Sequence, residues 1–148
     1  MKKENKVGFA LQGIKTEQFA VIKENYNANK KDVGLSTSIE FNLNEDEQSI
    51  SVFLGFEFSQ AKKVFIKIIV SCHFKIDEQS WKGFLDAKHS KMVISKGFLS
   101  HLAMLSVGTT RGVLFAKTEG TPFSSFMIPT LNVSEIIKED ASFEIKSK

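Results

Sequence analysis

Few side chains in this sequence are of the types that perform catalysis or bind metal ions, and their spacing keeps them apart. Cys72 and His73 are adjacent in a run that alternates like a β-strand, so they point to opposite faces and cannot form a thiolate–imidazole pair. His89 falls in a connecting segment and His101 in an expected helix, without the spacing of metal ligands. The acidic run 45–47 is interpreted as a solvated hairpin tip. We therefore take Cys72 as a buried structural thiol, and we expect no catalytic residue, no metal site, no cofactor and no enzymatic activity.

A second feature that could bind a ligand is a run with helical periodicity that contains Gly108 and Gly112. A phosphate-binding loop needs a strand, a glycine-rich loop and then Gly-Lys-Ser/Thr opening a helix, whereas these glycines lie inside the periodic pattern. Together with Ser100 and Ala116 they recur at multiples of four and share one stripe. Each glycine costs about 1 kcal/mol relative to alanine in a helix, so close approach of a neighbour would offset that cost. We expect a second chain's helix there, with Arg111 at the interface; the alternative is that the glycines face the protein's own sheet.

The elements that position these residues are predicted to be a sheet followed by a helix. Three runs alternate apolar and polar residues, at 35–43, 50–58 and 64–76. Polar tracts separate these runs, which predicts an antiparallel meander. Before them, 7–21 alternates and then shifts phase, as an edge strand with a bulge or bend would. The polar tract 24–34 is expected to be a mobile crossover loop.

After the sheet the apolar period becomes helical. Segment 77–91 is expected to be an irregular connector, and about 92–117 one long helix. Pro122 and Pro129 then break the chain, and 132–140 offers a short helix with Ser134 as its cap. The predicted fold class is α+β, with a four-stranded antiparallel sheet packed on one long helix and a short C-terminal helix, in a single domain spanning 1–148.

Composition narrows the class of protein. The 148 residues carry 20 basic and 17 acidic side chains, and this net charge of +3 is spread too evenly for a nucleic-acid-binding surface. One cysteine excludes an intramolecular disulfide, and the absence of a signal core or of an apolar run near 20 residues predicts a cytoplasmic protein without a membrane span. Fourteen phenylalanines exceed the need of one small core, so some rings are expected on a surface.

The expected apolar surface lies on the outer face of the sheet. Phe53, Phe65 and Ile69 alternate away from the main core set, and an exposed apolar strip predicts a binding surface for polypeptides. Trp81 and Phe84 in the connector are further candidates, since rings there either seal the core or line a groove.

Several segments, taken in order, resemble the SecB-type export chaperones. The opening Phe-x-Leu-x-x-Ile-x-x-x-x-Phe begins at Phe9, the three-strand meander follows, and the helix reaches Arg111 before a glycine turn and the Pro129-x-x-Asn132 ending. This resemblance implies a four-stranded sheet and a long helix, assembled as a homotetrameric dimer of dimers with the helices between two sheets.

The same resemblance implies an ATP-independent holdase that binds unfolded or precursor polypeptides in hydrophobic grooves and, in protein export, passes them to the SecA motor. SecB-like relatives also serve as chaperones of antitoxins, and the net basic charge differs from the acidic character of the export members. A dedicated adaptor for one such partner is therefore the alternative function. A third is a small enzyme or ligand carrier that uses the sheet cavity, which a closed polar pocket with convergent titratable groups would favour.

Overall fold

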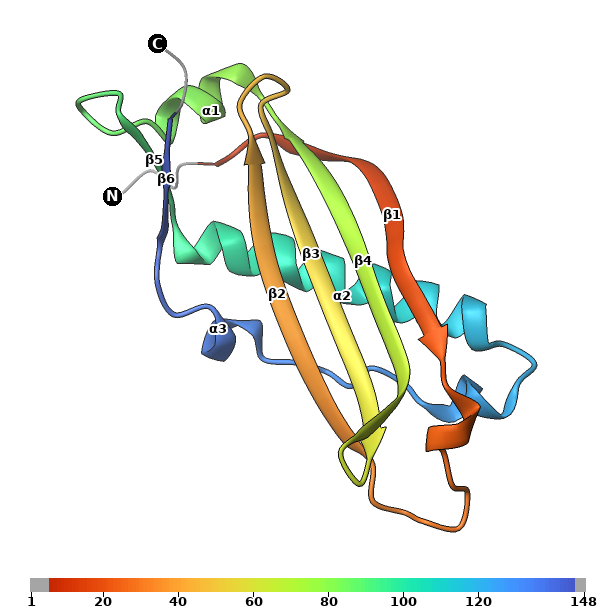
Figure 1. Cartoon of the computed structure of the whole chain (residues 1–148). Helices are drawn as coiled ribbons and strands as arrows, with labels where there is room; N and C mark the ends of the chain where they lie inside the picture. The colour runs from red at the N-terminus through yellow and green to blue at the C-terminus, as the bar shows by residue number, and fades with distance from the viewer. Residues whose placement is uncertain (1–5, 146–148) are drawn as a thin grey trace.

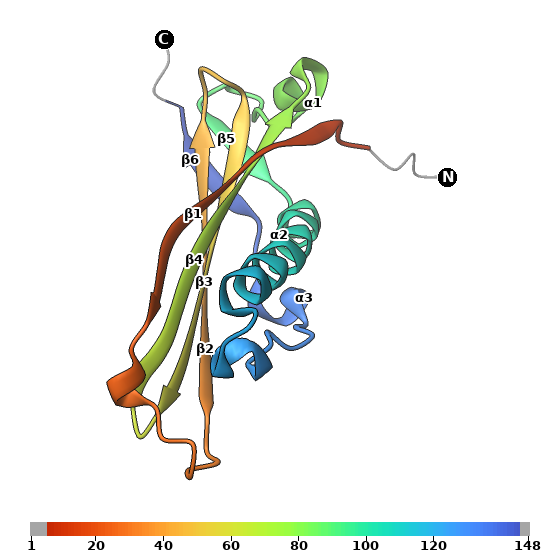
Figure 2. The same ribbon diagram turned by 90° about the vertical axis from the view of Figure 1, so that its right-hand side faces the viewer.

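The computed structural model describes residues 6–145 as a twisted antiparallel sheet with helices on one side (Figures 1 and 2). The sheet contains β1 (Phe9–Val21), β2 (Gly34–Asn44), β3 (Ser49–Gln60) and β4 (Lys63–Ile76), in the order β1-β4-β3-β2. The helices are α1 (Glu78–Gly83), α2 (Lys96–Thr118) and α3 (Val133–Ile136), with short 3-10 turns η1 (Lys23–Asn25) and η2 (Pro122–Ser125). A separate two-stranded sheet pairs β5 (Lys91–Ile94) with β6 (Ala141–Glu144). The predicted α+β class and four-stranded antiparallel sheet are confirmed.

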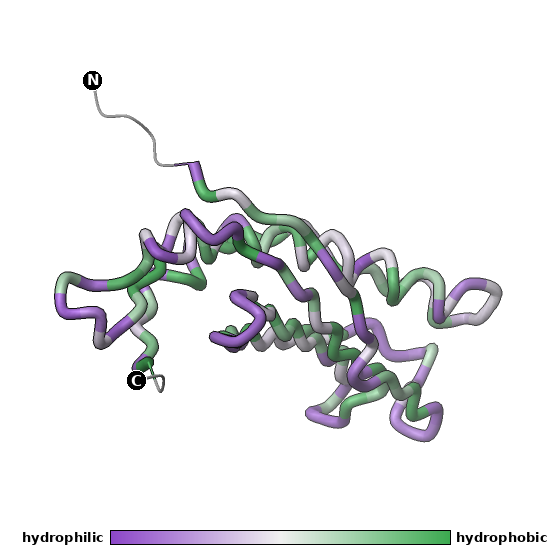
Figure 3. Tube along the Cα trace, turned by 90° about the horizontal axis from the view of Figure 1, so that it is seen from above, coloured by the Kyte–Doolittle hydropathy of each residue, from purple (hydrophilic) through white to green (hydrophobic). Residues whose placement is uncertain are grey.

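The core lies between the sheet and α2. Along β3, the alternating residues Ile50, Val52, Leu54 and Phe56 are fully buried, and their partners on β4 are buried with them. From α2 the core receives Leu99, Leu102, Ala103, Val107 and Leu114. Figure 3 shows the same division along the chain, with hydrophobic colour in the strands and the long helix and hydrophilic colour in most peripheral loops.

The two edge strands differ in regularity. β1 pairs with β4 with register shifts between Leu11 and Gly13 and between Thr16 and Gln18, which confirms the predicted irregular edge strand. All eleven residues of β2 pair with β3 without a shift. The bulges in β1 bend it away from a flat edge, as edge strands that avoid further pairing do.

The crossover between β1 and β2 was expected to be a mobile polar loop, and it is attached by hydrogen bonds to the β3–β4 hairpin at the same end of the sheet. The buried side chain of Gln60 accepts from the Asn27 N–H at 2.8 Å and donates to the carbonyls of Asn27 and Lys30 at 3.2 and 3.1 Å. Asn25 Nδ2 also donates to the Val64 carbonyl at 2.8 Å. These bonds hold the crossover against the β3–β4 hairpin.

The second half of the chain differs from its prediction in detail. The expected connector 77–91 contains α1, and the first residues of the expected long helix form β5 instead. α2 therefore begins at Lys96, where Ser95 Oγ accepts from the Phe98 N–H at 3.2 Å. The expected C-terminal helix is one turn long, Ser134 does not cap it, and the following residues form β6. Pairing between segments about fifty residues apart has no local sequence signal, which is why β5 and β6 were missed.

Candidate polypeptide-binding site

The outer, helix-free face of the sheet carries two of the three predicted apolar residues. Phe53 and Ile69 are half-buried there. Phe65 is fully buried instead, because Phe58 pairs with Ile66 while Ser59 pairs with Val64, which leaves Phe65 as the extra residue of a β-bulge. A bulge turns two consecutive side chains toward the same side of a strand. The prediction that Phe65 lies on the outer face is therefore wrong.

Polar side chains interrupt the rest of this outer face. The Ser71 hydroxyl donates to Glu17 Oε1 at 2.8 Å, so the same oxygen accepts from His73 Nε2 at 3.0 Å. In the neutral ring, His73 Nδ1 then accepts from the Ser51 hydroxyl at 2.7 Å. This polar chain crosses β3, β4 and β1 beside Phe53, whose ring lies 6.3 Å from that of His73. The outer face is mixed in character and is not a continuous apolar strip.

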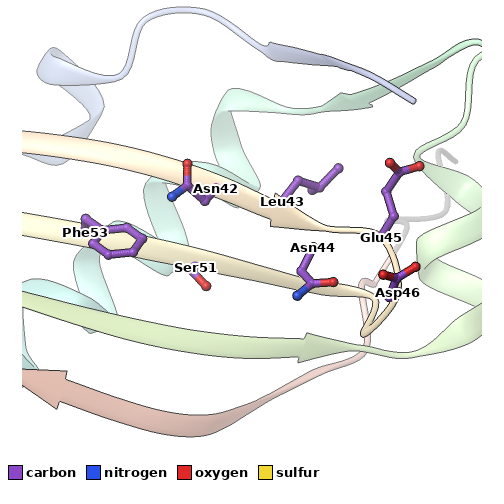
Figure 4. A pocket seen from close by; sticks show the side chains of 7 residues that line it. All are labelled: Asn42, Leu43, Asn44, Glu45, Asp46, Ser51 and Phe53. Carbon is purple, nitrogen blue, oxygen red and sulfur yellow. The ribbon is translucent and has the colours of Figure 1, made fainter. Parts of the chain in front are cut away.

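An open recess of about 620 Å³ lies on the same face, next to the hairpin that joins β2 to β3 (Figure 4). Its lining is largely polar, with Asn42, Asn44 and Ser51 beside the ring of Phe53 and carboxylates from the hairpin. Binding of apolar segments there would leave several amide and hydroxyl groups without water, which is costly. The recess is therefore a poorer binding site for an apolar polypeptide segment than a site lined by aromatic side chains would be.

Trp81 and Phe84 seal the core. Both are almost completely buried, in α1 and at its C-terminal end. The Phe84 ring lies 6.4 Å from Trp81 and 5.9 Å from Phe98 on α2. Of the two roles that the sequence left open, the structure favours packing over lining a groove, so the prediction of a binding role for these rings loses its basis.

Five aromatic rings lie together at the end of the sheet that carries the β3–β4 hairpin, and we call them the aromatic cluster. Its members come from the crossover, from strands β3 and β4, and from the segment after α2: Tyr26, Phe58, Phe65, Phe123 and Phe126. The Tyr26 ring lies 5.0 Å from Phe65, 5.2 Å from Phe123 and 5.5 Å from Phe126, mostly in tilted or edge-to-face contacts.

The aromatic cluster is partly open to solvent. Phe58, Phe65 and Phe123 are buried, whereas Tyr26 and Phe126 are half-buried and the adjacent Met127 is 48% exposed. Apolar surface is thus continuous from the core to the outside of the molecule. Sequence reasoning missed Tyr26, which stands in a polar tract, as well as Phe123 and Phe126; the surplus of phenylalanines was the signal that pointed to such a cluster.

A second set of exposed apolar side chains, which we call the α2–β1 surface, lies on the long helix and on strand β1. Its exposed side chains are Leu11, Ile14, Met104, Leu105 and Phe115. Phe9 contacts the His101 ring at 5.7 Å, and Lys117 Nζ lies 5.6 Å from the Phe19 ring. Leu11 and Ile14 lie between these two contacts along β1, and they pair with Phe74 and Cys72, which are buried in the core on the helix side of the sheet.

Gly108 and Gly112 belong to this exposed stripe. A methyl group placed on either glycine would meet no atom within 4 Å outside its own helix. The glycines therefore do not face the protein's own sheet, which excludes the alternative that the sequence left open. Their exposure next to Met104, Leu105 and Phe115 leaves an apolar helix face with room for a second backbone.

Arg111 has an intramolecular role in the protomer. Its Nε donates to the Ile128 carbonyl at 2.7 Å and its Nη2 to the Pro129 carbonyl at 2.8 Å. This pair of bonds fixes the segment after α2 against the helix, and so positions the residues that follow Phe126. A contact of Arg111 with another chain stays a prediction.

Cys72 and His73 point to opposite faces, as predicted. Cys72 is fully buried toward α2, and this burial raises the pKa of the thiol, while hydrogen bonds from Ser106 and Thr109 counteract only part of the effect. A thiol held protonated in this way is a poor nucleophile. Within residues 6–145, no three His, Cys, Asp or Glu side chains are grouped to hold a metal ion, and no helix has the length and hydrophobicity to cross a membrane.

No protein-family model matches the sequence, and no curated protein sequence matches it. Among solved structures, the chain is similar to the SecB-like chaperone Rv1957 of Mycobacterium tuberculosis, which was determined in complex with a ChAD peptide from the antitoxin HigA1 (Rv1956). The match has a TM-score of 0.46 and 11% sequence identity, and it covers 84% of this chain and 90% of that chain. At this level of similarity, the function of the chain has to be inferred from its own surfaces.

Proposed function

We propose that the protein is an ATP-independent holdase chaperone that binds unfolded or precursor polypeptides through the aromatic cluster. The observation that carries the proposal is the graded burial of this cluster, from fully covered rings inside to half-covered Tyr26 and Phe126 and exposed Met127 outside. An apolar client side chain that packs there extends an existing core, at about 25 cal/mol per Å² of buried apolar area before ordering costs. The flexible methionine suits clients of varied shape.

A hydrolase function has weaker support than a chaperone function. The pair Ser51 and His73 has the spacing of a nucleophile and a base. However, Ser51 stands in the middle of β3, which is hydrogen-bonded to a strand on each side, so its neighbouring backbone N–H groups are committed to the sheet. A tetrahedral intermediate would lack the free donors that stabilise its oxyanion.

The same proposal includes self-assembly in the cytoplasm. The α2–β1 surface is apolar, and its glycines admit a close helix, which supports an interface with a second copy of the chain. The resemblance to SecB-type chaperones suggests a dimer of dimers. A dedicated adaptor for one partner, such as an antitoxin, and delivery to the SecA motor are finer alternatives within this class.

The decisive experiment is suppression of aggregation without nucleotide, using several unrelated unfolded proteins. Protection of many clients supports a general holdase, protection of a single partner supports the adaptor, and protection of none refutes the chaperone proposal. The double variant Phe126→Ser/Met127→Ser should weaken protection several-fold. The matched control Phe53→Ser/Ile69→Ser removes apolar side chains from the outer face and should leave protection nearly unchanged. The opposite pattern would move the client site to the outer face.

Assembly is tested at the glycines. Gly108→Leu/Gly112→Leu should overpack the interface and lower the mass measured by light scattering, while the sheet stays folded by circular dichroism. Gly97→Leu is the matched control, because Gly97 also faces open space but lies in the first turn of α2. A monomeric wild type, or an unchanged mass for the double variant, would contradict the interface.

A further inference from the structure

We propose that a cluster of lysines beside the aromatic cluster binds acidic segments of client polypeptides. This basic tip consists of Lys30, Lys31, Lys62 and Lys63, from the crossover and the β3–β4 hairpin. It would select clients in which Asp or Glu residues flank an apolar, aromatic-containing stretch. The inference rests on the proposed function and adds a charge preference to it.

The fold brings the basic tip together from two distant parts of the chain. The crossover and the β3–β4 hairpin meet at the same end of the sheet (Figure 1). Gln60, the last residue of β3, bonds the backbone of Asn27 and Lys30, so the two lysine pairs are held on neighbouring segments. The buried position of Gln60 makes this link a fixed feature of the tip.

The charge of this tip is not neutralised by the chain itself. All four lysines are exposed, and none forms an ion pair with a carboxylate among residues 6–145. The crossover also contains a fifth lysine, Lys23, and two carboxylates, those of Glu24 and Asp32. The β2–β3 hairpin at the opposite end of the sheet carries the acidic run 45–47. The sheet is therefore basic at the end where the aromatic cluster lies.

The hairpin backbone is strained where it presents these lysines. Ala61 and Lys62 form the two-residue turn, and their φ angles are 49° and 66°, in the left-handed region. Turns of this kind favour Asn and Gly, because residues with a Cβ resist positive φ. Strained backbone conformations cluster at functional sites, and one of the two strained residues here is a lysine of the basic tip.

The basic tip adjoins the aromatic cluster directly. Lys63 precedes Phe65 by two residues, and Tyr26 lies four residues before Lys30. A shallow recess of about 550 Å³ separates the crossover from the hairpin and is lined in part by Lys31, Ser59 and Lys62. A client whose apolar side chain packs on the aromatic cluster would thus place its flanking residues beside positive charge, which favours carboxylates.

A polypeptide suits this tip better than a nucleic acid. The cluster rings pack edge-to-face or tilted on one another, and three of the five are buried, so they do not form the row of open aromatic faces on which successive bases stack. Asp32 lies within the recess and would repel a continuous phosphate backbone. A short acidic segment avoids that repulsion because it can place its carboxylates on the lysines alone.

The test uses three fluorescent peptides with one apolar, aromatic core and with Glu, Gln or Lys flanks. The wild-type protein should bind the Glu-flanked peptide about tenfold more tightly than the Gln-flanked one, as several partly screened ion pairs would give, with a smaller difference at high salt. The variant with all four lysines changed to Gln should lose this preference and keep its affinity for the Gln-flanked peptide. A variant with the four lysines changed to Arg should retain the preference.

A matched control changes Lys82, Lys88, Lys91 and Lys96 to Gln, which alters the net charge equally away from the tip, and it should preserve the preference. Equal wild-type affinity for Glu- and Gln-flanked peptides would overturn the charge preference and leave the holdase proposal standing. Failure to bind any of the peptides would instead remove the holdase proposal. Binding of a single-stranded oligonucleotide that depends on the same four lysines, with no preference among the peptides, would reassign the tip to nucleic acid.

Discussion

Replacing Phe65 with Ala should destabilise the protein strongly, because this ring is fully buried at the bulge in β4. Phe→Ala changes in a core cost about 3–5 kcal/mol in unfolding free energy. Phe65 contacts four other rings, with centroid distances of 5.0 Å to Tyr26 and Phe126 and 6.4 Å to Phe58 and Phe123. Since each aromatic pair adds stability beyond burial, we expect about 4–5 kcal/mol, in the upper part of that range.

Phe53→Ala is the internal comparison for this experiment. Phe53 is half-buried on the outer face, so its truncation should cost only about 1–2 kcal/mol, as expected for a partly covered ring. Urea denaturation at one fixed protein concentration measures both variants, because the proposed self-assembly would make stability depend on concentration. Equal losses for the two variants, or a loss below about 2 kcal/mol for Phe65→Ala, would refute the bulge-based assignment of Phe65 to the core.

Three further predictions concern the hydrogen bonds of Arg111, the turn between β3 and β4, and the thiol of Cys72. Arg111→Ala should lower the unfolding free energy by about 2–3 kcal/mol, because two carbonyl oxygens lose their guanidinium donor, and Arg111→Lys should restore little of it; denaturation of both variants checks this. Changing Ala61 to Asn and Lys62 to Gly should stabilise the protein by about 1 kcal/mol and raise its melting temperature, whereas a decrease would contradict a strained turn. The raised pKa of Cys72 means that the folded state holds this proton more tightly than the unfolded state does. Its contribution to stability is complete below the ordinary thiol pKa of 9.0 and is lost as pH rises through the folded pKa. Cys72→Ala should therefore flatten the alkaline decline in unfolding free energy, measured by denaturation across that range.

The two apolar surfaces of the chain have different physical characters, and this suggests different roles. The α2–β1 surface lies on a rigid helix and a paired strand and carries glycines that admit a backbone, as a permanent interface requires. The aromatic cluster includes rings from the crossover and from the segment after α2, which are held by a few hydrogen bonds. Segments of that kind adapt to varied ligands more easily than a long helix does.

The sequence was a reliable guide wherever the apolar period was long and local. Alternation over nine or more residues set the positions of β2, β3 and β4 to within a few residues, and the phase shift in 7–21 correctly indicated an irregular β1. The same alternation placed Cys72 and His73 on opposite faces. Each of these conclusions depends only on the geometry of neighbouring residues in one element.

Sequence by itself therefore determined the α+β class, the sheet and the long helix, because each pattern of hydrophobicity fits only one periodic backbone. Tertiary structure alone decided which rings are covered. A single extra residue in β4 turned Phe65 from the outer face into the core, and pairing across the fold brought Tyr26 onto Phe123 and Phe126. The exposure of Gly108 and Gly112 was likewise decided by the tertiary structure, because it depends on which face of α2 packs against the sheet. Contacts between segments distant in the chain have no periodic signal, so the binding surfaces that they create could be found only in three dimensions.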